Sequence, residues 1–417
     1  MKTVILGGSA FSTPALFAYL ACQPGVDGLT VTLVGRSRER VLGVERAAKL
    51  ICERNAIAVT SSTMSAEMLV NALKGAGLVL VQVRPGGHME RAVDEVFPRR
   101  YHLCGDEGLG IGGLRAAWRV WPTVRQLLNV VTEACPDALV VLLTAPLSLV
   151  VRLAHYCFPS MDLVGVCELP WTTLKKLSSK AGVNAEELDF DYVGVNHLGW
   201  FYRIDSGSRD LVDEYVARTE LQDSFPPAVL VRSLSAIPTA YLRLHYFPHE
   251  TLSEKGRELK SRGEQLQELS ERIPAIYQRG TRQQIIASLD LRPAPWYADV
   301  VGPLIMARYA GRPSCIPLFL TVRNAGYNPA FLSDDVLEIP HRFEEKKPVR
   351  QPIKVPPPAH IHETLTKFVR FERVAADAIR RRDLHQLEVA MASHPWIEDT
   401  RMIQAMMQDI TDNNLAR

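Results

Sequence analysis

Two short segments of the chain carry side chains that bind metal ions in proteins. Cys167 lies in the segment Gly165–Pro170, and His197 lies in the segment Gly194–Trp200. A thiolate together with an imidazole suits a borderline divalent metal, although two protein ligands leave the coordination incomplete. Water or the oxygens of a bound ligand would have to complete it. Either residue alone is also typical of ordinary packing in an apolar core, and that alternative stays open.

Arginine, glycine and carboxylate residues are concentrated in two further segments. The first is Gln82–Gly87, followed closely by Arg91 and Glu95, and the second is Gly105–Gly113. So many glycines and charges are poorly suited to a hydrophobic core and are typical of a loop that binds a polar ligand. For the arginines, a solvated surface is the alternative.

The first predicted strand leads directly into a glycine-rich turn. Thr3–Leu6 is strand-like, Gly7–Pro14 is the turn, and Thr13–Ala21 has the pattern of a helix. Such a turn lets backbone N–H groups approach the pyrophosphate of a dinucleotide. Serines stand at two positions of the usual three-glycine pattern, but they are small enough to permit a close approach; a tight turn without a ligand is the alternative. The candidate cofactor contacts are Gly7, Gly8, Ser9 and Thr13.

The residues that follow the second predicted strand bear on the choice of cofactor. The strand Leu29–Val34 ends at Gly35 and Arg36, where an acidic residue would bind the ribose hydroxyls of NAD. Arg36 could instead pair with the 2′-phosphate of NADP. The residues leave NAD and NADP both open, and an exposed arginine in an ordinary turn is the remaining alternative.

The first 168 residues alternate short apolar runs with helical stretches. The further strand-like runs are Leu78–Val83, Ala138–Leu143 and Val164–Cys167, and the helix Arg38–Arg54 follows the second strand. This alternation predicts a doubly wound, Rossmann-like parallel sheet. We therefore expect a dinucleotide-binding domain over residues 1–168.

Residues 169–417 have a different pattern, typical of an α+β domain that would carry substrate and metal. Long amphipathic stretches cover Leu252–Arg272 and His362–Arg382. The segment Pro348–Pro358 holds five prolines, which predicts an extended surface segment or linker. The strand-like pieces of this part are Tyr192–Val195, Leu318–Val322 and Val336–Ile339.

The composition is that of a globular protein without a bulk electrostatic preference. The 48 basic and 46 acidic residues nearly cancel, and 47% of all residues are hydrophobic. This balance argues against a nucleic-acid or membrane partner. The seven cysteines are scattered without paired spacing, as in reduced cytosolic proteins. The N-terminus has the pattern of a strand and not of a signal peptide, so we expect a cytoplasmic protein.

These segments, in this order, resemble the family 4 glycoside hydrolases, which include the 6-phospho-α- and 6-phospho-β-glucosidases. The family's opening Gly-Gly-Gly-Ser-x-x-Thr-Pro is similar to Gly7–Pro14, and its Cys-Asn-x-Pro and Asn-His-Leu motifs resemble Cys167–Pro170 and Asn196–Leu198. The likeness covers nearly the whole chain, and the ordered set is far more specific than any one motif. Further similar segments are Arg84–Glu95, Gly105–Gly113, Pro238–Arg243 and Val322–Gly326.

The resemblance implies a fold like that of lactate and malate dehydrogenases and hydrolysis of a glycoside through transient oxidation. NAD would take a hydride from C3 of the sugar, which acidifies the C2 proton. A base would remove that proton, the C1 group would be eliminated, water would add, and the stored hydride would reduce C3. Family 4 is an NAD-dependent exception to the usual two-carboxylate glycosidases. A homodimer or homotetramer is also implied.

The resemblance assigns roles to individual residues. Cys167 and His197 would hold Mn²⁺ or a similar divalent ion, and Tyr241 would remove the C2 proton. A free tyrosine, with a pKa of about 10, is a weak base at neutral pH, so Tyr241 would need a metal or a cation nearby. Glu168, where the family has Asn or Asp, is a candidate general acid. The implied substrate contacts are Arg91, Glu107 and Arg262, of which Arg262 is the looser match.

A departure from the family pattern bears on the substrate. The family's Asn-x-Thr-Asn-Pro corresponds to Leu142–Pro146, so both asparagines are replaced, by Leu142 and Ala145. The retained metal and base positions favour an active enzyme, similar to a 6-phospho-β-glucosidase, with a shifted substrate. Two other functions stay open. An NAD(P)-dependent sugar or hydroxy-acid dehydrogenase would accumulate reduced cofactor, and a non-catalytic nucleotide- or sugar-binding sensor would bind without turnover.

Overall fold

One large sheet organises the protein in the computed structural model, which describes residues 1–217, 225–311, 316–344 and 346–411. Its nine strands run in the order β13-β12-β11-β6-β5-β4-β1-β2-β3. The part from β3 to β6 is parallel and has the 3-2-1-4-5-6 order of dinucleotide-binding folds, which confirms the predicted α/β class. The parallel strands are β1 (Lys2–Leu6), β2 (Thr30–Gly35), β3 (Ala58–Thr63), β4 (Ala76–Val81), β5 (Leu139–Leu142) and β6 (Leu163–Val166).

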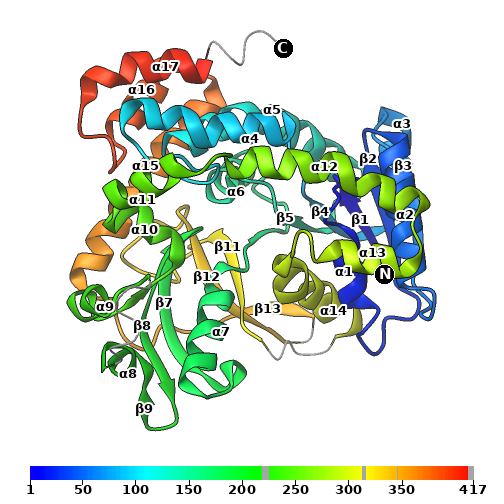
Figure 1. Ribbon diagram of the computed structural model, residues 1–417, viewed down its shortest axis with the longest axis horizontal. Helices are drawn as coiled ribbons and strands as arrows, with labels where there is room; N and C mark the ends of the chain where they lie inside the picture. Colours follow the sequence, from blue (N-terminus) through cyan, green and yellow to red (C-terminus); the bar gives the residue numbers. More distant parts are fainter. Residues whose placement is uncertain (218–224, 312–315, 345, 412–417) are drawn as a thin grey trace.

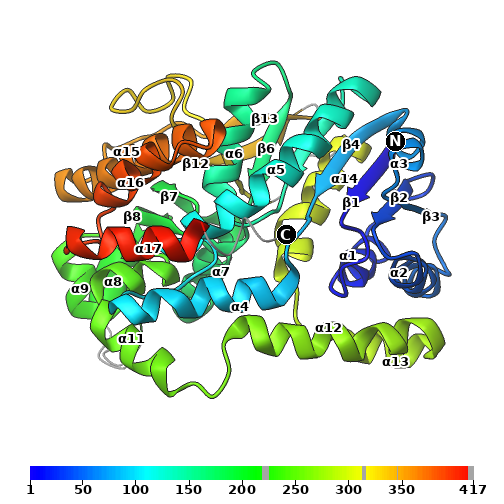
Figure 2. The ribbon, with the colours of Figure 1, turned by 90° about the horizontal axis from the view of Figure 1, so that it is seen from above.

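Helices cover both faces of this parallel sheet, which explains why its strands are almost continuously apolar. In β1, Val4 and Leu6 contribute to one hydrophobic core and Ile5 contributes to the other. Figure 2 shows the helices on the two sides of the strands. The first core, which contains Ile5, includes side chains of α1 (Pro14–Leu20) and α2 (Arg38–Ile51). The second core, which contains Val4 and Leu6, includes those of α3 (Ala66–Leu73), α5 (Gly110–Ala134) and α6 (Leu147–Cys157).

The sheet continues beyond the predicted domain boundary. Three later strands add to its edge in antiparallel fashion, with β11 hydrogen-bonded to β6. They are β11 (Leu318–Arg323), β12 (Val336–Glu344) and β13 (Lys347–Arg350). The expected strands Leu318–Val322 and Val336–Ile339 therefore exist, but they belong to the first sheet, whereas the expected strand Tyr192–Val195 belongs to a second sheet. The division between residues 168 and 169 stays a prediction.

A smaller antiparallel sheet packs against this added edge. It has the order β10-β8-β7, and β9 pairs with β8. Aromatic rings join the two sheets, because Phe190 of β7 stacks on Phe319 of β11 with ring centroids 5.6 Å apart. Figure 1 shows β7 and β8 beside β11 and β12. The bounds are β7 (Asp189–Val195), β8 (Leu198–Ser206), β9 (Arg209–Asp210) and β10 (Ile237–Pro238).

Two expectations for the C-terminal part need correction. The stretch Leu252–Arg272 is not one helix, because α11 (Pro248–Arg257) ends and α12 (Arg262–Arg279) begins anew. The Ser261 side chain accepts a hydrogen bond from the Glu264 backbone, and the Glu264 side chain accepts one from the Ser261 backbone, so a capping box starts the second helix. The prolines at 348–358 are not all in a free linker either, since residues up to 350 pair with β12.

The remaining helices surround the two sheets. The long C-terminal helix α15 (Ala359–Arg381) confirms the amphipathic stretch predicted there, and α4 (Gly87–Val96) packs against α12. Within the described ranges, no helix is both long and apolar enough to cross a membrane. The others are α7 (Leu169–Ala181), α8 (Leu211–Ala217), α9 (Ala228–Leu234), α10 (Arg243–Tyr246), α13 (Arg282–Leu289), α14 (Gly302–Ala310), α16 (Leu384–Ala392) and α17 (Ile403–Thr411).

The capping box gives a testable prediction for stability. Ser261→Ala removes the acceptor for the first turn of α12 and should lower the free energy of unfolding by about 1 kcal/mol, measured by urea denaturation. Arg272→Ala, on the exposed side of the same helix, is the control and should change stability by less than about 0.5 kcal/mol. Equal effects of the two changes would show that the cap does not determine where α12 begins.

Candidate active site

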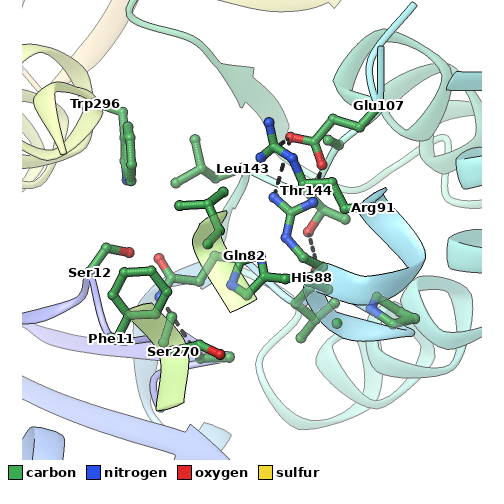
Figure 3. Close-up of a pocket in the computed structure, with 18 of the residues that line it drawn as sticks. Phe11, Ser12, Gln82, His88, Arg91, Glu107, Leu143, Thr144, Ser270 and Trp296 are labelled. Atoms are coloured by element: carbon green, nitrogen blue, oxygen red, sulfur yellow. Dashed lines mark hydrogen bonds and ion pairs between the residues drawn. The ribbon is translucent and has the colours of Figure 1, made fainter. Parts of the chain in front are cut away.

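A cavity of about 470 Å³ opens at the carboxyl ends of the parallel strands, where ligands bind in doubly wound folds. Figure 3 shows its wall, with Phe11 and Trp296 on one side and the pair Arg91 and Glu107 on the other. It brings together most of the residues predicted from the sequence. Those that line it are Gly7, Ser9, Arg36, Arg91, Glu107, Cys167, Glu168, His197 and Tyr241.

The glycine-rich turn forms the cofactor end of the cavity by packing closely against two strands. Gly7 has a φ of +89°, and a Cβ on it would lie 2.9 Å from the Gln82 carbonyl oxygen. A Cβ on Gly8 would lie 2.9 Å from the Leu33 backbone. A side chain is thus excluded at Gly7 and at Gly8, and glycine there is typical of a turn that a pyrophosphate approaches closely. Gly8 and Thr13 are buried behind the cavity wall and do not line it.

Gln82 fixes this turn, a role that the sequence did not reveal. Its side-chain N–H group donates to the Gly7 carbonyl at 3.2 Å and to the Thr13 hydroxyl at 2.9 Å. Its carbonyl oxygen accepts from the Tyr297 hydroxyl at 2.8 Å. The Gln82 side chain therefore links Thr13 to Gly7, at the two ends of the turn. A glutamine directly after a buried strand was the available signal, but Tyr297 is too distant in sequence to suggest the contact.

Cys167 and His197 reach the cavity from different sheets. Cys167 follows β6, and His197 forms the turn between β7 and β8, where its φ of 70° is in the left-handed region. The Cys167 thiol donates to a Glu168 carboxylate oxygen at 3.9 Å. Burial, Glu168 and Glu338 all raise the pKa of the Cys167 thiol. Without a cation at this point, the thiol form is therefore favoured.

The two side chains fit a metal site whose coordination is completed from outside the protein. The buried Nδ1 atom of His197 has no hydrogen-bond partner, which leaves a nitrogen available near the cavity. No cluster of three or more His, Cys, Asp or Glu suited to a metal occurs in the described part of the chain. Cys167 and His197 would consequently be two protein ligands, and substrate oxygens or water would supply the rest. A divalent charge there would favour the thiolate.

Tyr241 lies directly on His197, with ring centroids 4.2 Å apart and an angle of 9° between the planes. It is placed by a short 3₁₀ turn, Ala240–Leu242, after β10. The carboxylate of Asp106, burial and the carboxylate of Glu107 raise the pKa of Tyr241 above its usual value. A proton-accepting role for Tyr241 therefore requires a positive charge beside it, as the sequence argument anticipated.

Glu107 is held by two arginines in the wall of the cavity. Arg84 forms an ion pair with it, and Arg91 Nη1 lies 2.7 Å from Glu107 Oε1 while Arg91 Nε donates to Glu95 at 2.7 Å. Burial opposes the charge of Glu107, but Arg84 and Arg91 outweigh it and lower its pKa to about 2. Two carboxylates thus already neutralise Arg91, which leaves little of its charge for a substrate.

Of two further arginines, only Arg292 lies where a substrate anion could reach it. Arg262, a predicted substrate contact, is exposed, donates to Gln265 at 3.0 Å and does not line the cavity. Arg292 does line it, lies over the Trp296 ring at 5.0 Å, and makes no ion pair among the described residues. Burial, Arg262 and Arg91 lower the pKa of Arg292 to about 10. Arg292 was not predicted, because a single arginine in a proline-rich loop has no distinguishing pattern.

The two positions that depart from the family pattern differ in location. Leu142 is fully buried in β5 and contributes to the second hydrophobic core. Ala145 lines the cavity, beside Thr144, whose hydroxyl donates to the backbone carbonyls of Val81 and Val83 at 3.2 Å. The replacement by Ala145 therefore changes the cavity surface, whereas Leu142 changes the core behind it.

The arginine pair around Glu107 predicts a pH-dependent contribution to stability. A carboxyl with a folded-state pKa of about 2 and an ordinary value of 4.5 stabilises the fold above about pH 4.5 and loses that effect as the pH falls towards 2. Glu107→Gln should therefore lower the free energy of unfolding at pH 7 by on the order of 3 kcal/mol.

Urea denaturation of both proteins between pH 7 and pH 2.5 tests this. The difference in unfolding free energy between wild type and Glu107→Gln should shrink as the pH falls. Glu186→Gln, which removes an exposed carboxylate, is the control and should have little effect at any pH. A difference that stays constant down to pH 2.5 would contradict the role of the arginines.

Comparison with known proteins identifies relatives over the full length of the chain. The 6-phospho-beta-glucosidase BglT of Thermotoga maritima is 22% identical over 432 residues, which covers 99% of this chain and 98% of the relative. An alpha-galacturonidase of Thermoanaerobacterium saccharolyticum is 33% identical over 143 residues, which covers 32% of this chain and 31% of the relative.

Solved structures have the same fold. A 6-phospho-beta-glucosidase of Thermotoga maritima, solved with manganese, NAD⁺ and glucose-6-phosphate, has a TM-score of 0.87 at 20% identity and covers all of this chain and 98% of that one. A 6-phospho-alpha-glucosidase from gut microorganisms, in complex with NAD and Mn²⁺, has a TM-score of 0.83 at 18% identity with the same coverage. A lactate dehydrogenase from a Medee basin deep-sea metagenome library has a TM-score of 0.53 at 13% identity and covers 91% of this chain and 98% of that one, which confirms the predicted dehydrogenase-like fold.

Two family models account for nearly all of the chain. Residues 2–183 match the model described as family 4 glycosyl hydrolase, and residues 192–397 match the model of the family 4 glycosyl hydrolase C-terminal domain. Together with the cavity at the carboxyl ends of the strands, these matches show that the chain belongs to the family 4 glycosyl hydrolases.

Proposed function

We propose that this protein hydrolyses anionic O-glycosides, with 6-phospho-glucosides as the first candidates, using NAD and a divalent metal ion. The convergence of Cys167, Glu168, His197 and Tyr241 on the cavity that the glycine-rich turn also lines carries the proposal. Two candidate ligands for one metal ion, a candidate acid and a candidate base share one cavity with the glycine-rich turn. This combination suits a redox-assisted elimination.

Each side chain has a role in this proposal. When bound, NAD supplies hydride acceptance and a divalent ion supplies positive charge beside the sugar hydroxyls. Cys167 and His197 hold the ion, and Tyr241, stacked on His197, takes the C2 proton. Glu168, which adjoins Cys167, is placed to donate a proton to the departing oxygen at C1.

The charge of the cavity supports an anionic sugar. Arg84 and Arg91 are paired with carboxylates, whereas Arg292 makes no ion pair among the described residues and so can pair with an incoming anion. The relatives fit this chemistry, since one is a 6-phospho-beta-glucosidase and another an alpha-galacturonidase. We place a 6-phosphate ahead of a carboxylate because the full-length relative acts on a phosphorylated sugar.

The cofactor proposal favours NAD over NADP. Both named 6-phospho-glucosidase structures contain NAD. Arg36 nevertheless lines the cavity after β2, without an acidic residue beside it to bind the ribose hydroxyls, so NADP belongs in any assay. A homodimer or homotetramer and a cytoplasmic location remain expectations from the family resemblance.

The decisive measurement is nitrophenol release from nitrophenyl 6-phospho-α- and 6-phospho-β-glucosides and from their unphosphorylated forms. NAD or NADP and Mn²⁺ are each added or omitted. We expect release that requires both cofactor and metal, faster with the β anomer, and no net accumulation of NADH. Stoichiometric NADH would instead indicate a dehydrogenase, and ligand binding without any turnover would indicate a sensor.

The metal assignment predicts the effect of two substitutions. Cys167→Ser and His197→Ala should each lower Mn²⁺-dependent kcat at least about 100-fold, because each removes one of only two protein ligands. Circular dichroism should show a folded protein in both cases. Cys157→Ser, at a half-buried thiol on α6 outside the cavity, is the matched control and should keep wild-type activity. Unchanged activity in either ligand variant would exclude that ligand.

Arg292 predicts how the anion is recognised. Arg292→Gln should raise KM for a phosphorylated glycoside about 10- to 100-fold, because it removes a charge-assisted contact, and should leave an unphosphorylated glycoside unaffected. Arg279→Gln, at the exposed end of α12, is the control. An equal increase of KM for both substrates would show that Arg292 does not recognise the anion.

A further inference from the structure

A buried glutamate connects the two sheets that supply the proposed metal ligands. Glu338 lies near the start of β12 and is only 2% exposed. Its neighbour across the ladder is Thr321 of β11, which in turn pairs with Gly165 of β6, two residues before Cys167. Glu338 is therefore aligned across the strands of the large sheet with Gly165, close to the end of β6 that carries Cys167.

Both side-chain contacts of Glu338 lead to the smaller sheet. The Tyr192 hydroxyl of β7 donates a short hydrogen bond to Glu338 Oε2, and Asn196 Nδ2 donates to Oε1 at 3.3 Å. Within the described residues, Glu338 has no cation as a partner. Asn196 immediately precedes His197, and its side-chain amide is near enough to Cys167 to favour the thiolate form. The same amide thus donates to Glu338 and lies near the thiol, and its own backbone leads into the imidazole.

The glycines of the hairpin make this arrangement possible. A Cβ on Gly199 would lie 1.9 Å from the Tyr192 hydroxyl, and a Cβ on Gly194 would lie 3.0 Å from the same oxygen. The Tyr192 side chain therefore lies across the paired glycines of β7 and β8 to reach Glu338. Glycine at both positions leaves room for the Tyr192 side chain to reach Glu338.

We infer that Glu338 is a positioning residue which, through Asn196 and Tyr192, holds Cys167 and His197 at the separation that a divalent metal ion requires. This inference rests on the proposed function and deepens it. The two carboxyl oxygens of Glu338 bind the two side chains at once, which fixes the Asn196 amide in one orientation. Groups that orient metal ligands typically affect metal affinity by 10- to 100-fold when they are changed.

The alternative explanation is that Glu338 only stabilises the packing between the sheets. Glu372 provides the comparison, because it is also a buried glutamate: it accepts from Ser148 at 2.7 Å and lies 3.8 Å from Arg152, outside the cavity. A purely structural loss should look alike at the two positions. A positioning role should affect metal affinity at Glu338 alone.

The test titrates the full-length protein with Mn²⁺ alone and follows free Mn²⁺ by electron paramagnetic resonance. Glu338→Met, of similar length but without acceptors, should weaken binding 10- to 100-fold. Glu338→Gln keeps an acceptor for Asn196 and should recover most of the affinity. Glu372→Met is the matched control and should bind Mn²⁺ like wild type. Wild-type affinity in Glu338→Met, equal losses in Glu338→Met and Glu372→Met, or no recovery in Glu338→Gln would overturn the inference.

Two further variants make the outcome decisive. If Glu338→Met lacks a cooperative unfolding transition, Tyr192→Phe replaces it, because this change removes one hydroxyl and keeps the ring; a weaker Mn²⁺ affinity supports the inference and an unchanged one overturns it. Cys167→Ser separates the two proposals. If Cys167→Ser binds Mn²⁺ as tightly as wild type, the metal assignment itself is wrong. If it loses Mn²⁺ while Glu338→Met does not, only the role of Glu338 is wrong.

Discussion

The contact between the edge of the large sheet and the β7–β8 hairpin determines whether this protein has an active site. Cys167 stands at the end of a parallel strand, whereas His197 is in the hairpin and Tyr241 stacks on its ring. No single element supplies two of these side chains. Because protein interiors are closely packed, a shift of the hairpin by even 1 Å would move the His197 imidazole relative to the Cys167 thiol, and the proposed function requires the two to hold one ion. The aromatic rings between the sheets and the buried Glu338 both oppose such a shift.

The distribution of charge in the cavity follows from the same geometry. Asp106 and Glu107 lie on the side of Tyr241, and they raise its pKa. Arg292 lies on the cavity wall without a carboxylate partner among the described residues. In a partly desolvated cavity, the carboxylates near Tyr241 favour a cation beside them, and Arg292 favours an anion beside it. A divalent metal and a phosphorylated sugar have this pair of charges, so cofactor and substrate would each relieve an imbalance that the protein alone leaves in place.

Local patterns predicted the elements well, and contacts between distant segments were where prediction stopped. The turn Gly7–Pro14 was recognisable because glycines between a strand and a helix have a local physical meaning. The capping box at Ser261 is equally local, yet the amphipathic pattern across Leu252–Arg272 concealed it. Strands β11 and β12 were predicted, but nothing local indicates that β11 pairs with β6, which lies far earlier in the chain, or that β12 then pairs with β11. Glu338 and Arg292 were not predicted for the same reason, because their contacts are with residues that only the fold brings near.

The departure at residues 142–146 shows how position in the fold decides the weight of a substitution. An asparagine at position 142 would have to satisfy its amide inside β5, where Leu142 is fully buried, so leucine there is a change of core packing. Ala145 instead faces the cavity, next to the Thr144 hydroxyl that is committed to the backbone of the neighbouring strand. An alanine in place of an amide removes an NH₂ donor group and a carbonyl acceptor from the cavity surface and leaves a small apolar surface. A ligand with an apolar group, or with no substituent, beside Ala145 would lose no hydrogen bond. A ligand with a hydroxyl at that point would lose its hydrogen-bond partner. In the proposed function, this departure therefore acts on the substrate through Ala145 alone, and it leaves the proposed metal ligands and the proposed base unchanged.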